Sequence, residues 1–141
     1  MFDFSALNWW AILGCMIVCV ISGSTWFNPK TFFTVWWRGI GKSESDIPGN
    51  GQNMGIVFGL TFLSSFVQPL IMAIVLHLMF PNGATIIEGI TTGCLLWFGF
   101  VAPTYLVNKL FAGHPIYVWA IEVSNHLVNF VLFGLILSAW K

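Results

Sequence analysis

Long apolar runs separated by short polar segments dominate the hydrophobic pattern of this chain. Each run has at least about 20 residues, enough at a rise of about 1.5 Å per residue to cross a hydrocarbon core about 30 Å thick. We predict four membrane-spanning helices, over residues 7–27, 54–80, 84–111 and 116–140. Because the connections after the second and third runs are short, neighbouring helices must be antiparallel. The pattern predicts an all-α integral membrane protein, a single transmembrane domain over residues 1–141 with up-down-up-down bundle topology.

The long connection, residues 28–53, begins with a pattern of its own. Asn28 followed by Pro29 is typical of a helix N-cap and first helical position. Over residues 29–40, aromatic side chains then fall on one helical face and polar ones on the other. We predict a short amphipathic helix in the membrane interface, with a gate or lipid-binding element as the alternative. Its predicted anchors are Phe33, Trp36, Trp37 and Arg38.

Composition and charge narrow the class of partner. The chain is 57% hydrophobic and 7% charged, whereas globular domains have about 25% charged residues. The net charge of zero leaves no basic face for nucleic acid. We therefore expect the partners to be the lipid bilayer and either further copies of the chain or other membrane subunits. No basic segment precedes the first apolar run and no small-x-small cleavage site follows it, so we interpret it as a retained span.

The basic residues predict the orientation. The two connections on one side of the membrane contain Lys30, Arg38, Lys42 and Lys109, while the other side has only Lys141. By the positive-inside rule, both connections lie in the cytoplasm and both termini lie outside it.

Polar side chains form a stripe along the fourth predicted span. Glu122, Asn125, His126 and Asn129 are spaced i, i+3, i+4 and i+7, so they share one helical face. Glu122 lies about 10 Å and His126 about 16 Å from the cytoplasmic end of the helix. One turn apart, these two side chains are placed to share a proton or to form an ion pair.

The other predicted spans place polar side chains at similar depths. We therefore predict a buried polar site formed by Glu122, His126, Asn125, Asn129, Gln68, Ser64 and Tyr105. One interpretation is structural, since interhelical hydrogen bonds contribute roughly 0.5–2 kcal/mol each in membranes. The other is a polar cavity, open to the cytoplasm, that binds or passes a proton, ion or small polar solute. A second, interfacial pair, His77 and Glu88, lies on either side of the Pro81-Asn82-Gly83 turn and is either a structural tie or the opposite end of such a path.

Metal binding and catalysis are not indicated. The cysteines Cys15, Cys19 and Cys94 all lie inside apolar runs, and the three histidines fall at different depths. No zinc-protease or serine-hydrolase motif is present in the sequence. We expect no metal site and no enzymatic activity, and the sequence specifies no cofactor.

A third functional hypothesis is a non-catalytic accessory or scaffold subunit of a larger membrane complex. The 8 Trp and 14 Phe residues favour contacts with protein or pigment. Gly55-x-x-x-Gly59 and Gly89-x-x-x-Gly93 permit close helix packing, either within the chain or with a partner.

Several short motifs resemble a known family. They are Asn8-Trp9, Gly23-x-x-Trp26-Phe27-Asn28-Pro29, Phe33-x-x-x-Trp37 and Trp97-x-Gly99-Phe100, followed by Asn125, Asn129, Gly134 and Trp140. With these motifs the chain resembles the membrane proteins grouped as domain of unknown function 1761, over nearly its whole length. Phe27 and Asn28 stand where that family usually has tyrosine and serine. The resemblance implies four membrane helices and no established activity.

Overall fold

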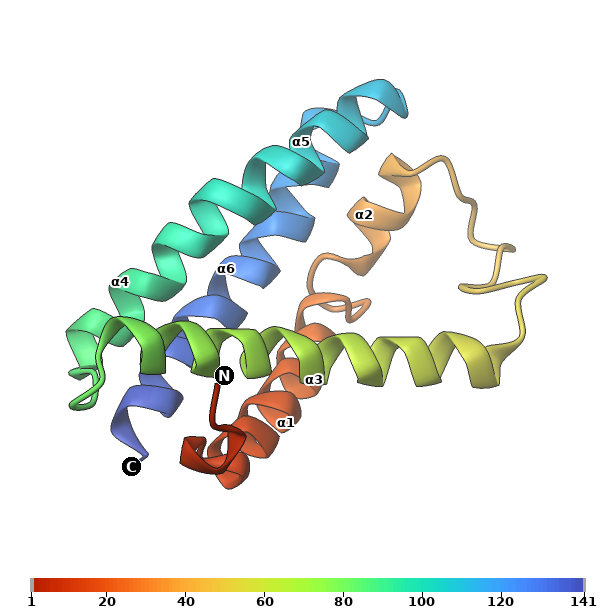
Figure 1. The fold of residues 1–141 in the computed structure, drawn as a ribbon. Helices are drawn as coiled ribbons and strands as arrows, with labels where there is room; N and C mark the ends of the chain where they lie inside the picture. Colours follow the sequence, from red (N-terminus) through yellow and green to blue (C-terminus); the bar gives the residue numbers. More distant parts are fainter. Residues whose placement is uncertain (1, 141) are drawn as a thin grey trace.

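The computed structural model describes residues 2–140, and within this range it is built from helices without β-strands (Figure 1). Four helical segments are long and apolar enough to cross a membrane, which confirms the predicted fold class. The segments are α1 (Trp9–Trp26), α3 (Met54–Met79), the α4–α5 rod (Ile86–Phe111) and α6 (Ile116–Ala139). The short helix α2 (Phe33–Gly39) lies between the first and second of them, and the 3-10 turn η1 (Phe4–Ala6) precedes α1.

Local sequence signals set the helix starts. The Asn8 side chain accepts a hydrogen bond from the backbone N–H of Ala11 and caps α1, and Asn53 caps α3 in the same way. Thr85 and Glu88 form a reciprocal capping box at the start of α4. Each cap satisfies backbone N–H groups that have no partner within the helix.

The third span is a helical rod interrupted by one wide turn. The π-helical segment η2 (Trp97–Val101) separates α4 (Ile86–Leu96) from α5 (Ala102–Phe111). Pro103 lies two residues after the last residue of this segment. Proline has no N–H and its ring crowds the carbonyl four residues earlier, so one α-helical hydrogen bond is lost there and a wider turn is favoured. The predicted disturbance at Pro103 thus takes the form of a π-turn, whereas α3 runs through Pro69 as one helix.

Helices α4 and α6 pack closely because glycines remove side chains from their contact. A Cβ atom added to Gly89 would collide with the carbonyl oxygen of Gly134, and one added to Gly93 with that of Phe130. Gly55 and Gly59, in contrast, meet no other helix. The Gly89-x-x-x-Gly93 motif is therefore used within the chain.

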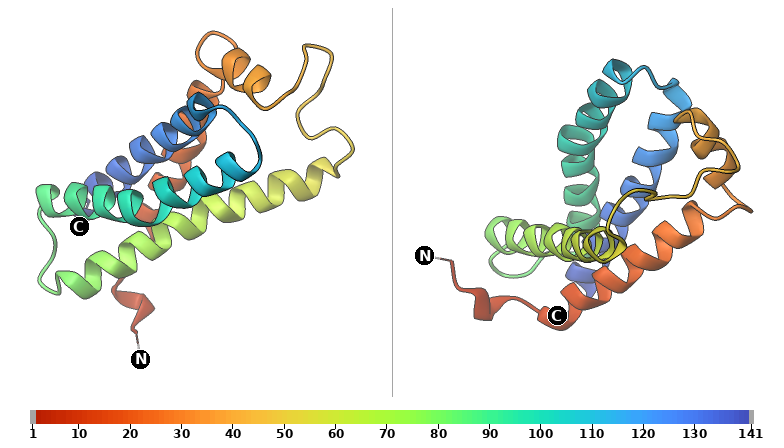
Figure 2. Two further views of the ribbon diagram at one scale, coloured as in Figure 1. Left: turned by 90° about the horizontal axis from the view of Figure 1, so that it is seen from above. Right: turned by 90° about the vertical axis from the view of Figure 1, so that its right-hand side faces the viewer.

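Helix α3 crosses the other spans obliquely, and only part of it is covered (Figures 1 and 2). Its second half packs on α1 and α6, where Met72 is 1% exposed. Its first half, residues 54–64, is almost entirely exposed.

Both termini lie at one end of the molecule, where the Asn8 side chain donates a hydrogen bond of 3.0 Å to the Trp140 carbonyl. The residue 28–53 connection and the α5–α6 turn lie at the opposite end.

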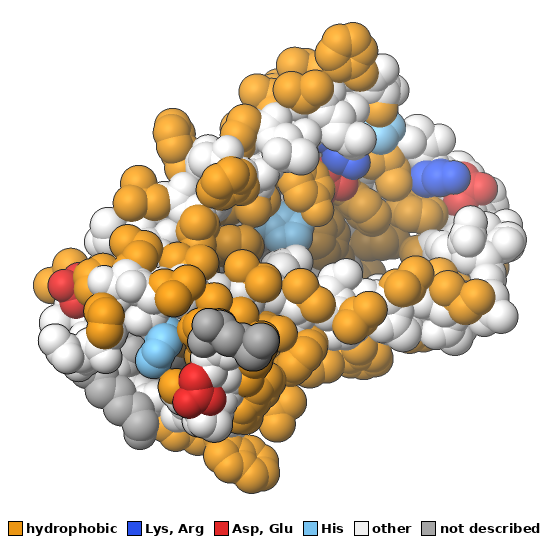
Figure 3. Space-filling view, in the orientation of Figure 1, with side chains coloured by type: hydrophobic (Ala, Val, Ile, Leu, Met, Phe, Trp, Pro, Cys, Tyr) orange, Lys and Arg blue, Asp and Glu red, His pale blue; other side chains and the backbone are white. Residues whose placement is uncertain are grey.

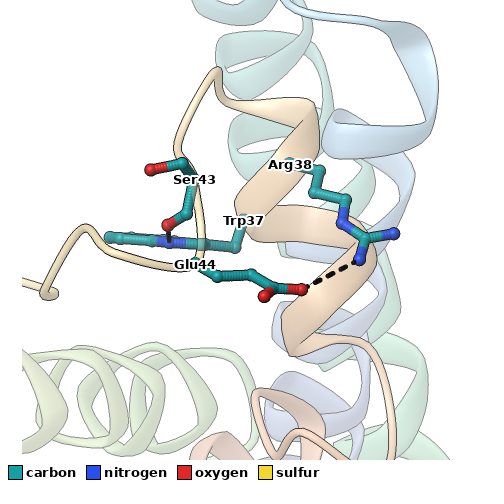
Figure 4. A network of polar contacts seen from close by, with 4 residues as sticks. All are labelled: Trp37, Arg38, Ser43 and Glu44. Atoms are coloured by element: carbon teal, nitrogen blue, oxygen red, sulfur yellow. Dashed lines mark hydrogen bonds and ion pairs between the residues drawn. The ribbon is translucent and has the colours of Figure 1, made fainter.

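Helix α2 is present as predicted but is shorter than its predicted range of residues 29–40. It begins at Phe33 rather than at residue 29, because the Asn28 side chain accepts the Lys30 N–H and closes a turn there instead of capping the helix. Trp37 is 8% exposed and donates its indole N–H to the Ser43 carbonyl at 2.9 Å (Figure 4). Trp37 therefore packs mainly inside the protein, and its role as an interfacial anchor stays a prediction.

The segment after α2 is held by polar contacts at the surface. Arg38 pairs with Glu44 at 3.4 Å (Figure 4). The backbone and side chain of Ser43 donate hydrogen bonds to Asp46, and these hydrogen bonds lower the pKa of the Asp46 carboxyl below its usual range. Arg38 keeps the exposed position that its prediction as an anchor requires.

Candidate functional site

The polar stripe of α6 faces the interior of the protein. Glu122 is 9% exposed, Asn125 5% and Asn129 2%. Asn125 and Asn129 lie against α1, whereas Glu122, nearer the start of α6, lies against α5 and α2. Buried amides in a membrane span are costly unless they find partners, so their surroundings decide what they do.

A cavity of about 680 Å³ lies between α1, α3, α5 and α6. In the space-filling view, the molecule is hollowed between α3 and the α5–α6 hairpin (Figure 3). The lining includes six of the seven residues predicted for the buried site: Ser64, Gln68, Tyr105, Asn125, His126 and Asn129. The structure thus brings these six residues, from three different spans, to the wall of one cavity.

Hydrogen bonding within the cavity wall is incomplete. Asn125 donates to the Ser22 hydroxyl at 2.8 Å, and Asn129 donates to the Cys19 sulfur at 3.6 Å. The His126 ring packs on Tyr105, with ring centroids 5.0 Å apart. The side-chain oxygens of Gln68 and Asn129 and the Nδ1 atom of His126 are buried without a partner.

Those three unpartnered atoms disfavour the interpretation that the polar side chains of the cavity serve only to hold the helices together. A buried polar atom without a hydrogen bond costs about 1–3 kcal/mol. Interhelical hydrogen bonding would leave few such atoms, because each polar side chain would be placed opposite a partner. Three such atoms lie around this one cavity, where they are placed to exchange hydrogen bonds with water or with a bound molecule.

Glu122 does not line this cavity. One of its carboxylate oxygens, Oε1, lies 3.1 Å from the Lys109 ammonium and accepts a hydrogen bond of 3.0 Å from the Trp36 indole. The side chains of Lys109 and Glu122 are 15% and 11% exposed. The predicted partnership of Glu122 with His126 is therefore replaced by an ion pair with Lys109. Trp36, predicted as an interfacial anchor, is half-buried, and its indole connects α2 to α6.

Lys109 is the site residue that sequence reasoning missed. From the sequence, Lys109 is predicted only to mark a cytoplasmic connection by its charge. In the structure it belongs to the last turn of α5. Lys109 and Glu122 lie on either side of the tight α5–α6 turn at Gly113. In such an antiparallel hairpin, a lysine near the helix end reaches a carboxylate on the neighbouring helix with its long side chain. The turn position was the signal that could have revealed the pair.

The second predicted pair, His77 and Glu88, is divided between two structural roles. The Glu88 carboxylate accepts hydrogen bonds from the backbone and hydroxyl of Thr85. The His77 ring packs edge-on against Phe2 and lines a separate cavity of about 370 Å³ near the chain termini. His77 thus lies at the opposite end of the bundle from His126.

One layer of apolar side chains separates the two cavities. Cys15, Met72 and Phe133 are each at most 1% exposed and belong to one core cluster. Each lies four residues from a residue lining the larger cavity: Cys19, Gln68 and Asn129. Four residues correspond to about 6 Å along a helix. The larger cavity therefore ends against an apolar layer that begins about one helical turn beyond its lining residues.

Within residues 2–140, no three of the histidine, cysteine and acidic side chains come together as a group that could hold a metal ion.

The four apolar helices and the cavity between them define the class of protein. It is a multi-span membrane protein with a polar cavity that is lined by no acidic or basic side chain other than His126. The chain belongs to the family described as Protein of unknown function (DUF1761), whose model matches residues 10–138. This match confirms the resemblance seen in the sequence. No curated protein and no solved structure matches the chain.

Proposed function

We propose that this protein binds a proton, an ion or a small polar solute in the cavity between α1, α3, α5 and α6, without catalysing a reaction. The observation that carries the proposal is the incomplete hydrogen bonding of Gln68, His126 and Asn129 around that cavity. Its volume of about 680 Å³ falls within the range of roughly 300–1,000 Å³ typical of small-molecule sites.

Passage across the membrane requires one further step. The apolar layer of Cys15, Met72 and Phe133 closes the cavity on the side of the chain termini. Binding from one side is therefore the resting activity, and transport requires this layer to open. The second cavity, lined by His77, is where a transported solute would emerge.

The test is a flux and binding assay on protein reconstituted in liposomes. Proton flux is followed with an enclosed pH dye, alkali cations with ion-selective dyes, and neutral solutes such as urea by vesicle swelling. We expect at least one of these to exceed the rate in protein-free liposomes. His126→Phe and Asn129→Leu should abolish that excess because both replace polar groups of the cavity wall.

Ser124→Ala is the matched control, since the Ser124 hydroxyl bonds only to backbone carbonyls of its own helix. It should retain the wild-type rate. Equal rates in wild-type protein, His126→Phe and Asn129→Leu would refute passage through the cavity.

We further propose that the large connection and the α5–α6 turn face the cytoplasm, so that the cavity opens toward it. The four basic residues at that end of the molecule support this orientation. Ser45→Cys, in the exposed connection and in a background in which Cys15, Cys19 and Cys94 are replaced by alanine, should be labelled by an impermeant thiol reagent only from the cytoplasmic side. Labelling from the outside would contradict the proposed orientation and place the connection outside the cytoplasm.

A second candidate function, an accessory subunit of a larger membrane complex, is favoured by the uncovered first half of α3. Residues 54–64 carry exposed Thr61 and Ser64 within a membrane span, and a Cβ on Gly59 would meet no other atom. A partner helix would fit closely against such a surface. Mass determination of the intact assembly in mild detergent distinguishes the two functions, because stoichiometric foreign subunits would support the accessory role.

A further inference from the structure

An apolar groove adjoins the polar cavity on the outer surface of α1 and α3. It encloses about 230 Å³ and is formed by Met16, Ile17, Val20, Ile21 and Phe62. Ile17 and Ile21 are 61% and 60% exposed. As both helices are membrane spans, this surface faces hydrocarbon when it is not otherwise covered.

The groove and the cavity form one continuous depression. Val20 and Phe62 line both of them. The outer rim of the cavity is also apolar and exposed, with Phe58 and Leu60 more than half accessible. A molecule dissolved in the bilayer can therefore reach the polar inner wall sideways, without crossing the apolar layer at Phe133.

The cavity lining contains no lysine, arginine, aspartate or glutamate. Lys109 does not line it and is bound to Glu122. A phosphate or a fixed cation placed in the cavity would have no opposite charge nearby, at a high desolvation cost. The polar groups present are the amides of Gln68, Asn125 and Asn129, with the Tyr105 hydroxyl and the His126 imidazole. These groups both donate and accept hydrogen bonds.

From these observations we propose that the depression binds an amphipathic, lipid-like molecule with an uncharged head. The head, carrying hydroxyl or amide groups, occupies the polar cavity, and the hydrocarbon tail lies along the groove between α1 and α3. This inference rests on the proposed function in taking the cavity as a binding site. It goes further by naming a membrane-dissolved ligand with a neutral polar head.

Photo-crosslinking with two probes tests the inference. Both probes carry the same diazirine-labelled acyl chain, one on a glycerol head and the other on a phosphate head, and the full-length protein is held in lipid nanodiscs. The glycerol probe should give saturable labelling of residues 16–21 and Phe62, competed by unlabelled monoacylglycerol. The phosphate probe should bind at least about tenfold more weakly, a difference of about 1.4 kcal/mol.

Two variants address the two halves of the depression. Val20→Trp fills the junction between groove and cavity and should lower saturable labelling at least about tenfold. Leu13→Trp places the same side chain on an exposed position of α1 outside both cavities, so it should label like the wild type. Asn129→Leu removes a polar group of the head site and should also weaken labelling, with His126→Phe as the replacement if that variant fails to fold.

The possible failures are distinguishable. Equal, non-saturable labelling by both probes would mean ordinary lipid contact and overturn the inference. Crosslinks between two copies of the chain through residues 16–21 would make the groove a subunit interface and also overturn it. If Asn129→Leu abolishes binding of a water-soluble solute while Val20→Trp has no effect, the proposed function holds and the lipid-like ligand is excluded. Failure of both cavity variants to affect any binding would overturn the proposed function as well.

Discussion

At the scale of single residues, Lys109 and Glu122 form a largely buried ion pair. In such a position, either charge without the other would destabilise the folded protein. Their side chains are 15% and 11% exposed and lie 3.1 Å apart. We expect Glu122→Gln and Lys109→Met each to destabilise the protein by about 3–5 kcal/mol, since each leaves the other charge buried and unpaired. Thermal unfolding in detergent measures both effects.

The double variant Lys109→Met/Glu122→Leu removes both charges and should recover most of that loss. Arg38→Ala is a matched control, because its pair with Glu44 is 66% and 89% exposed and should contribute little. Additive losses in the double variant would show that the two side chains act independently. In that case Trp36, whose indole also bonds to Glu122, would be the more important partner.

The residues of the cavity were accessible to prediction to different degrees. Asn125, His126 and Asn129 share a face through helical spacing alone, and counting depth along each span placed Gln68, Ser64 and Tyr105 beside them. Counting residues along each span could not identify Lys109 as the partner of Glu122. Helical spacing relates residues on one helix, whereas the Lys109–Glu122 contact depends on how two helices meet across a turn.

At the scale of helices, the contact between α4 and α6 depends on glycine at both surfaces. A Cβ on Gly134 would collide with the backbone carbonyl of Gly89, which cannot move away without shifting the helix. We expect Gly134→Ala to cost about 1–3 kcal/mol through overpacking. The change is measured by thermal unfolding of the purified protein.

Gly59→Ala supplies the control, because a Cβ there meets nothing within 4 Å. Alanine is the better helix former by roughly 0.5–1 kcal/mol, so this variant should be unchanged or slightly more stable. A large loss for Gly59→Ala would mean that a partner helix covers α3 in the native assembly. A neutral Gly134→Ala would contradict the close α4–α6 packing.

The four spans were predictable because length and apolarity determine which segments can cross a bilayer. The first residue of α2 could not be predicted in this way, since the sequence Asn28-Pro29 fits both a helix cap and a turn. The contacts of Asn28 and Thr31 with nearby backbone decide between them. Likewise, Pro103 predicts a disturbed helix, but only the surrounding packing determines that the disturbance is a π-turn.

At the scale of the whole molecule, the crossing of α3 over the other helices creates the cavity. The second half of α3 joins the core, while its first half leaves the bundle (Figure 1). Polar side chains of α3 such as Ser64 and Gln68 therefore line the cavity. The sequence shows polar positions on α3 but not this angle, because both halves are equally apolar. The cavity and the layer that closes it are therefore properties of the assembled fold.

That apolar layer leads to the final prediction. Phe133 is fully buried between the two cavities, and Phe133→Ala removes the largest side chain of the layer. We expect proton leak through liposomes containing this variant to exceed that of the wild type, because water can then approach from both ends. Met72→Ala should act in the same direction. The same truncation at Phe98, which is 71% exposed, should leave the leak unchanged.

Stability has to be followed alongside the leak, since Phe→Ala in a core costs about 3–5 kcal/mol. Phe133→Leu keeps most of the apolar volume and serves as the milder variant, with a leak between those of the wild type and Phe133→Ala. A graded leak that follows side-chain volume while the protein stays folded would identify the layer as the barrier to passage. Equal leaks for Phe133→Ala and Phe98→Ala would mean that the cavity serves binding alone, with the solute entering and leaving on the same side.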